Sequence, residues 1–263
     1  MTTSLLNSLL RALLRWGAAL VFCLPLRHRS HFWARACGML FPLLLLAQLL
    51  DPLAQSTTLW QQQLLLLALY ISFFALLGGM IYLCTDINKK GAMYCAVWSL
   101  LIAQCAYEGW CFLELQFARY GHPLNMASPW AVLVQLLSGA VFFAAVYLLL
   151  ARQLPYKGEY HIGPRQLFSA FFIGILFMVQ AAVLDNFRAE QFPRSVIATI
   201  LIGQFYFITL LYFQSELFKK SAMEKEMNAL NLLYERQRQQ YQVARQNVQI
   251  INKRCHELKV QIA

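Results

Sequence analysis

One dipeptide near the end of the chain combines an imidazole with a carboxylate. His256 is followed directly by Glu257, within the polar stretch that begins after Phe213. A neutral imidazole nitrogen can attack a phosphoryl group, and an adjacent carboxylate can take the proton from the other ring nitrogen. The pair therefore predicts a phosphoacceptor, with His256 as nucleophile and Glu257 as its acid/base neighbour. Taken alone, the dipeptide is equally typical of a solvated helix surface.

A heptad pattern places this pair beside a seam of apolar residues. From Gln214 to Ala263 the chain has no glycine or proline, and apolar residues recur at alternating spacings of four and three. This pattern predicts a long helix that must bury its seam against a partner, and a parallel homodimer is the simplest partner. The seam residues are Met223, Met227, Leu230, Tyr234, Tyr241, Ala244, Val248, Ile251, Cys255, Leu258 and Ile262, with Gln237 as the one polar interruption.

The segment before this helix is typical of a membrane protein. Hydrophobic residues make up 59% of the 263 residues and charged residues 13%, whereas soluble domains carry about 25% charged residues. Long apolar stretches separated by Pro, Gly, Asp and Asn indicate membrane-spanning helices. We predict an all-α fold in which residues 32–218 form a transmembrane sensor domain and 219–263 a cytoplasmic coiled coil. The six predicted spans are about 32–50, 59–84, 91–115, 129–151, 165–185 and 195–218.

The distribution of positive charge predicts the orientation. Basic residues gather between Arg27 and Arg35, at Lys89-Lys90, between Arg152 and Arg165, and after Lys219. Positively charged loops stay in the cytoplasm, so we expect both termini on the cytoplasmic side. The same rule accounts for the net charge of +10 without nucleic acid as a partner.

Residues 1–31 have two interpretations. Arg11 and Arg15 fall roughly on one helical face with Ser4 and Ser8, and leucines cover the rest. This pattern favours an amphipathic helix lying in the membrane interface. A seventh span remains open if the two arginines are neutralised or snorkel to the interface.

Ionisable and aromatic residues in the predicted outer half of the membrane indicate where a ligand would bind. Glu108, Trp110, Glu114 and Asp185 could line an outward-facing pocket for a cationic or polar ligand. Glu114 and Asp185 could equally be interfacial residues that touch water, and Glu108 could pair with a polar residue of another helix. Seven cysteines without a C-x-x-C pair predict neither a disulfide nor a metal site.

The stretch Asn252 to Lys259, which reads Asn-Lys-Arg-Cys-His-Glu-Leu-Lys, resembles a known phosphoacceptor box. It is similar to the box of the peptide-pheromone-type (AgrC-like) sensor histidine kinases of Gram-positive bacteria, which have a GHKL ATPase domain. The resemblance implies that His256 is phosphorylated and that Glu257 is its acid/base neighbour. It also implies an external signal, often a peptide, a cytoplasmic response regulator as partner, and a multi-pass location in the bacterial plasma membrane.

The part of that family that binds ATP has no counterpart in these residues. We find no Asn-containing or Gly-rich box of the GHKL type and no G-x-x-x-x-G-K motif. We therefore expect no cofactor in this chain, with ATP and Mg²⁺ held by a separate catalytic domain. The chain would be either a piece that ends before that domain or a natural remnant.

Two other functions remain open at this point. A membrane scaffold would use the coiled coil to recruit a cytoplasmic partner without any chemistry at His256. A small transporter would use Glu108, although no internal repeat of the kind common in transporters is visible.

Overall fold

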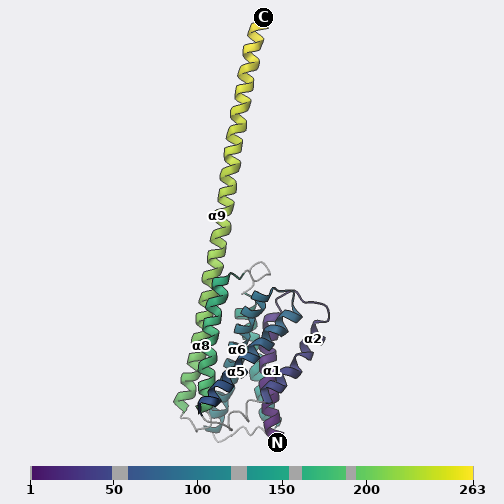
Figure 1. Ribbon diagram of the computed structural model, residues 1–263, viewed down its shortest axis with the longest axis vertical. Helices are drawn as coiled ribbons and strands as arrows, with labels where there is room; N and C mark the ends of the chain where they lie inside the picture. Colours follow the sequence, from purple (N-terminus) through teal and green to yellow (C-terminus); the bar gives the residue numbers. More distant parts are fainter. Residues whose placement is uncertain (1, 49–58, 120–128, 154–161, 188–193, 263) are drawn as a thin grey trace. The chain divides into compact units, whose positions relative to one another are not determined.

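The fold is a helical bundle followed by a single helix (Figure 1). The computed structural model describes residues 2–48, 59–119, 129–153, 162–187 and 194–262, and every regular element in them is a helix. Contacts divide the chain into one unit of residues 1–215 and a second of residues 216–263. The elements are α1 (Thr2–Cys23), α2 (Phe32–Gly38), α3 (Leu40–Gln48), α5 (Leu59–Cys84), α6 (Lys89–Arg119), α7 (Pro129–Val146), the π-helix η1 (Tyr147–Ala151), α8 (Pro164–Phe187) and α9 (Arg194–Ile262).

Three helices among the described residues are long and apolar enough to cross a membrane. They comprise Leu64–Cys84 of α5, Lys89–Ala118 of α6, and Trp130–Ala151 of α7 with η1. Phe32–Gln48 and Pro164–Gln180 are apolar but shorter. The all-α class and the presence of membrane-length helices are therefore confirmed, whereas six spans remain a prediction.

The predicted span at 32–50 is interrupted within its described part. Helix α2 ends at Gly38 and α3 begins at Leu40, so Met39 lies in a turn between two helices. Pro42 has no N–H to donate to the carbonyl four residues earlier, which belongs to Gly38, and its ring crowds that carbonyl. Glycine also loses more conformational entropy in a helix than other residues do. Together these two residues break the helix where hydrophobicity alone predicts continuity.

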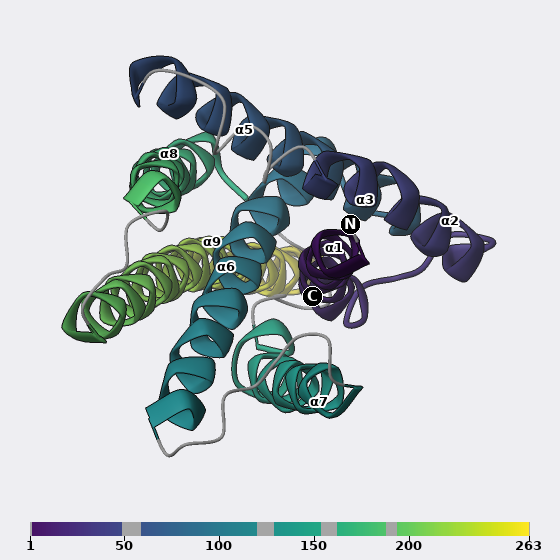
Figure 2. The same cartoon turned by 90° about the horizontal axis from the view of Figure 1, so that it is seen from below.

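Helix α1 lies inside the bundle and not along its edge (Figure 2). It packs against α3, α5, α6 and α7, and its small residues Ala12, Ala18 and Ala19 are fully buried. A helix in the membrane interface would keep one face on water. The packing therefore favours the alternative in which α1 is an additional helix of the bundle.

Gly17 lets α1 approach α7 closely. A Cβ built on Gly17 would lie 2.9 Å from Cε2 of Phe143, whereas a Cβ on Gly79 of α5 meets nothing within 4 Å. We expect Gly17→Leu to lower the free energy of unfolding by about 1–3 kcal/mol through overpacking. Unfolding of the purified protein in detergent would measure this, with Gly79→Leu as the control. Equal stability of the two variants would contradict the close contact.

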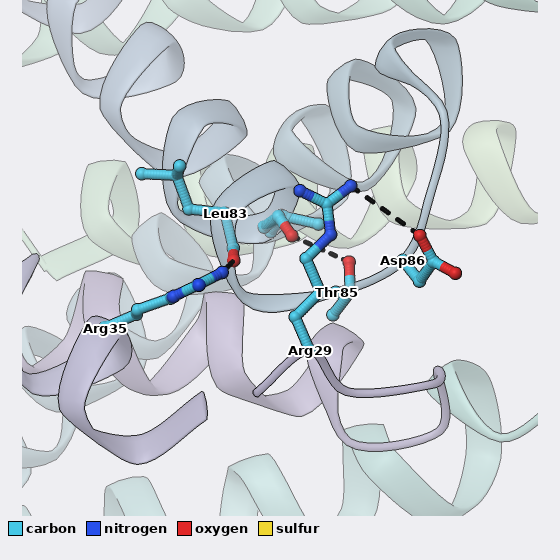
Figure 3. A network of polar contacts seen from close by, with 6 residues as sticks. Arg29, Arg35, Leu83, Thr85 and Asp86 are labelled. Atoms are coloured by element: carbon cyan, nitrogen blue, oxygen red, sulfur yellow. Dashed lines mark hydrogen bonds and ion pairs between the residues drawn. The ribbon is translucent and has the colours of Figure 1, made fainter. Parts of the chain in front are cut away.

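The loop after α1 is tied to the C-terminal end of α5 (Figure 3). The backbone N–H of Arg29 donates to the carbonyl of Cys84 over 3.0 Å. The Arg29 guanidinium lies 3.7 Å from the carboxylate of Asp86. Arg35 Nη1 donates to the carbonyl of Leu83 over 2.9 Å. Carbonyls in the last turn of a helix lack partners within it, and cations stabilise that end. The predicted cytoplasmic cluster of arginines thus also caps α5.

In the second unit, residues 216–263, the described backbone belongs to α9. Every described side chain of this unit from Met223 onward is exposed to solvent. Its predicted seam is exposed in the single chain: Leu230 is 66% exposed, and Met227, Tyr234, Tyr241, Val248 and Ile251 are also exposed. Apolar side chains in a row on an isolated helix favour burial against a partner. The helical prediction is confirmed over the described backbone, and the coiled coil itself stays a prediction.

Candidate functional site

Two arginines of α1 turn toward aromatic rings inside the bundle. Arg15 is 6% exposed, and its guanidinium carbon lies 4.0 Å from the centroid of the Phe73 ring. Arg11 Nη2 donates a hydrogen bond of 2.7 Å to the hydroxyl of Tyr107, and the guanidinium carbon lies 4.8 Å from the centroid of that ring. A guanidinium is weakly hydrated and stacks well on aromatic faces. These rings therefore allow α1 to bring two cations into the bundle.

Glu108 of α6 belongs to the same polar cluster. Its side chain is 1% exposed, and Gln104 Nε2 donates to Glu108 Oε1 over 3.0 Å. The Tyr70 hydroxyl donates in turn to Gln104 Oε1 over 3.4 Å, which connects α5 to α6. A buried carboxylate is stable only when hydrogen bonds or opposite charges replace its lost hydration. The arrangement supplies Glu108 with a donor, Gln104, which also lines the small cavity beside both guanidinium groups.

The space within this cluster is too small for an organic ligand. Arg11, Arg15, Tyr70, Gln104 and Tyr107, together with Leu14 and Ala103, line a cavity of about 10 Å³. A single water molecule needs about that volume. The cluster is therefore a polar connection between helices and not a pocket for a signal molecule.

A much larger cleft lies between α1, α6, α7 and the first turns of α9. Its volume is about 780 Å³, within the range of ligand sites, and its walls are almost entirely apolar. The walls come mainly from α6 and α7, with Leu14 from α1 and Leu201 and Phe205 from α9. Trp110 and Trp130 both line it, Trp110 buried and Trp130 exposed. The described residues that line it include no charged side chain.

The predicted ligand-binding residues do not converge on one pocket. Trp110 lines the cleft, whereas Glu108 lies in the polar cluster, about 200° around the helix from Trp110 at 100° per residue. Glu114 is half-buried on α6 and is not among the residues that line the cleft. Asp185 lies on the backbone of α8, and its side chain falls outside the described residues.

His256 and Glu257 lie on the backbone of α9, near its end at Ile262. Their side chains fall outside the described residues, so the geometry of the dipeptide remains a prediction. The same holds for Cys255 and Leu258 of the seam.

Sequence reasoning missed Gln135 as a component of the cleft. Gln135 is 4% exposed and lines the cleft from α7. It is the only amide side chain in the apolar segment 129–151, and a polar residue within a membrane-length helix is a functional candidate by default. That signal was available, although an amide carries no charge and is easily overlooked beside glutamates.

Comparison with known proteins identifies no relative. No protein-family model matches the chain, and neither a curated protein nor a solved structure is significantly similar to it.

Proposed function

We propose that the chain is the receptor part of a dimeric membrane signalling kinase, with His256 as its phosphoacceptor. The observation that carries this proposal is the extent of α9. The helix contributes Leu201 and Phe205 to the cleft, and the same helix, Arg194–Ile262, contains His256. A single helix that includes both a ligand-binding wall and a reactive residue is a simple means of coupling the two. A binding event in the membrane would then alter the presentation of His256 to a cytoplasmic ATPase domain.

The proposed reaction is a phosphoryl transfer. A neutral ring nitrogen of His256 attacks the γ-phosphorus of ATP, an N–P bond forms, and the P–O bond to ADP breaks. The proton on the other ring nitrogen passes to the carboxylate of Glu257. A separate GHKL-type domain would hold ATP and Mg²⁺, and a response regulator would then accept the phosphoryl group.

Phosphorylation in trans tests the proposal. The purified chain is incubated with a GHKL-type ATPase domain and γ-labelled ATP, and acid-labile label on the chain is counted. We expect His256→Gln to lose the label completely, because it removes the nucleophile, and Glu257→Gln to be labelled about a hundredfold more slowly. His28→Gln, the same substitution outside α9, serves as control and should be labelled like the wild type.

Equal labelling of His256→Gln and the wild type would contradict phosphoacceptance. A scaffold function predicts that result, combined with loss of activity when the seam of α9 is disrupted. The two outcomes separate the receptor function from recruitment through the coiled coil.

A further inference from the structure

Two residues that line the largely apolar cleft contain buried polar side-chain atoms. Trp110 is 3% exposed and Gln135 4%, and both line the cleft. Among the described residues, neither Trp110 Nε1 nor Gln135 Oε1 has a hydrogen-bond partner. Buried polar groups are paired in the great majority of cases, so an unpaired one calls for a partner such as a water molecule or a bound ligand. One of these atoms is a donor and the other an acceptor.

The rest of the wall selects against a charged molecule. The described lining residues have no charged side chain. Those with a polar atom in the side chain are Trp110, Trp130, Gln135, Ser138 and Cys105, and the others are apolar. Burying an unpaired charge there would cost far more than burying a hydroxyl or an amide. The wall therefore favours an uncharged ligand, whereas Glu108 suggested a cationic or polar one. Glu108 belongs to the separate polar cluster and does not line the cleft.

Exposed apolar side chains flank the cleft on helices that are long and apolar enough to cross a membrane. Leu133, Leu137 and Val141 of α7 line the cleft and are exposed, as is Phe205 of α9. Helices α6 and α7 are both long enough to cross a bilayer. Hydrocarbon surrounds the exposed apolar flank of such helices, so a molecule dissolved in the bilayer can enter laterally.

We propose that the cleft binds an uncharged, membrane-dissolved amphiphile with a long hydrocarbon chain and a hydroxyl or amide head group. The head group accepts a hydrogen bond from the Trp110 indole N–H and donates one to Gln135 Oε1, once both side chains turn to present these atoms, which are covered in this structure. The hydrocarbon chain lies against the leucine, valine and phenylalanine side chains of α6, α7 and α9. This proposal concerns binding alone and stands apart from the chemistry of His256.

Photolabelling tests the proposal. The full chain in lipid nanodiscs is irradiated with a long-chain fatty alcohol that carries a mid-chain diazirine, and labelled peptides of α6 and α7 are quantified by mass spectrometry. Two matched probes have the same chain, one with a carboxylate and one without any head group. We expect the alcohol to label these peptides most strongly, and excess unlabelled alcohol to compete for the site.

Two variants assign the binding to the cleft. Gly109 lines the cleft, and a Cβ there meets nothing within 4 Å, so Gly109→Leu fills the cleft without a clash. Gly79→Leu on α5 is the matched control, because its Cβ also meets nothing within 4 Å. We expect about tenfold less labelling by the alcohol in Gly109→Leu and no change in Gly79→Leu. Equal labelling of these variants would overturn the site.

Gln135→Leu separates the head group from the hydrocarbon chain. The substitution keeps the size of the side chain and removes the acceptor, so labelling by the alcohol should fall about fivefold. Labelling by the probe without a head group should stay the same, because that probe makes no hydrogen bond. An equal loss for both probes, or the strongest labelling by the carboxylate, would overturn the proposed head-group chemistry.

Discussion

Leu230→Lys is expected to separate the dimer that the α9 seam predicts. The leucine lies at a seam position and is 66% exposed in the single chain, so a partner helix would bury it in both copies. Removing a buried leucine costs about 2–5 kcal/mol, so two copies cost at least about 4 kcal/mol per dimer even before the ammonium is desolvated. That loss weakens association by about a thousandfold.

Leu232→Lys is the matched control for this variant. Leu232 is 62% exposed, carries the same side chain and lies on the same helix, but it falls on the face opposite the seam. The two substitutions change charge and helix propensity equally and differ only in their place in the heptad. If Leu232→Lys dissociated the protein as strongly as Leu230→Lys, the predicted register would be wrong.

Oxidative cross-linking through the native Cys255 measures dimerisation of α9 directly. This cysteine occupies a seam position, so two copies in a parallel, in-register dimer would bring their thiols together. Mild oxidation of the wild type should give a cross-linked dimer on a non-reducing gel, and Leu230→Lys should give little. Cys255→Ser should abolish the cross-link in either background. Efficient cross-linking of Leu230→Lys would contradict the prediction.

The helices of the bundle were largely predictable, because local residues set their ends. The predicted span 59–84 coincides with α5, and 129–151 with α7 and η1. At the start of α6, the Asn88 side chain accepts a hydrogen bond of 2.7 Å from the backbone N–H of Gly91, as the polar punctuation before that helix indicates. Such signals depend only on neighbours in the sequence, so they can be read without the fold.

The surroundings of α1 were not predictable from its periodicity. A face with Arg11 and Arg15 indicates contact with a polar medium, and water is the usual one. In the structure that medium is formed by Tyr107, Gln104 and the rings of other helices. Tyr107, which accepts the hydrogen bond from Arg11, lies 96 positions away in the chain, where no local pattern records the contact.

The residues that line the cleft were also not predictable from closeness in the sequence. Glu108 and Trp110 are close in sequence, so they suggested one pocket, yet they lie on different faces of α6. Helical geometry alone could have placed them on different faces, because side chains two positions apart on a helix point about 200° apart. Which face meets a cleft and which meets a polar cluster depends on the packing of α1 and α7.

Glu108→Leu is expected to destabilise the bundle more than a substitution at any other carboxylate whose side chain is described. Glu108 is the acceptor for Gln104 Nε2, and Gln104 in turn lines the small cavity beside the 6% exposed Arg15. Removing one member of a buried charged cluster leaves its counterpart uncompensated and costs about 3–5 kcal/mol. Unfolding of the purified protein by titration with SDS would measure the change.

Glu108→Gln isolates the contribution of the charge. The amide keeps the shape of the side chain and an oxygen acceptor for Gln104, so we expect a smaller loss than in Glu108→Leu. Glu114→Leu is the control, because Glu114 lies on the same helix, is half-buried and does not belong to the cluster. It should change the free energy of unfolding by less than about 1 kcal/mol.

A double substitution decides whether the cluster is electrostatically coupled. If Arg15 is stabilised by the Glu108 carboxylate, then Arg15→Leu in the Glu108→Leu background removes an uncompensated cation and should restore part of the lost stability. Apolar replacement of a complete buried charge group is often neutral or stabilising, whereas removal of one partner is costly. Two independent sites would instead give additive losses. Recovery in the double variant would show that Arg15 is retained in α1 with the help of the Glu108 carboxylate on α6, and additive losses would contradict that interpretation.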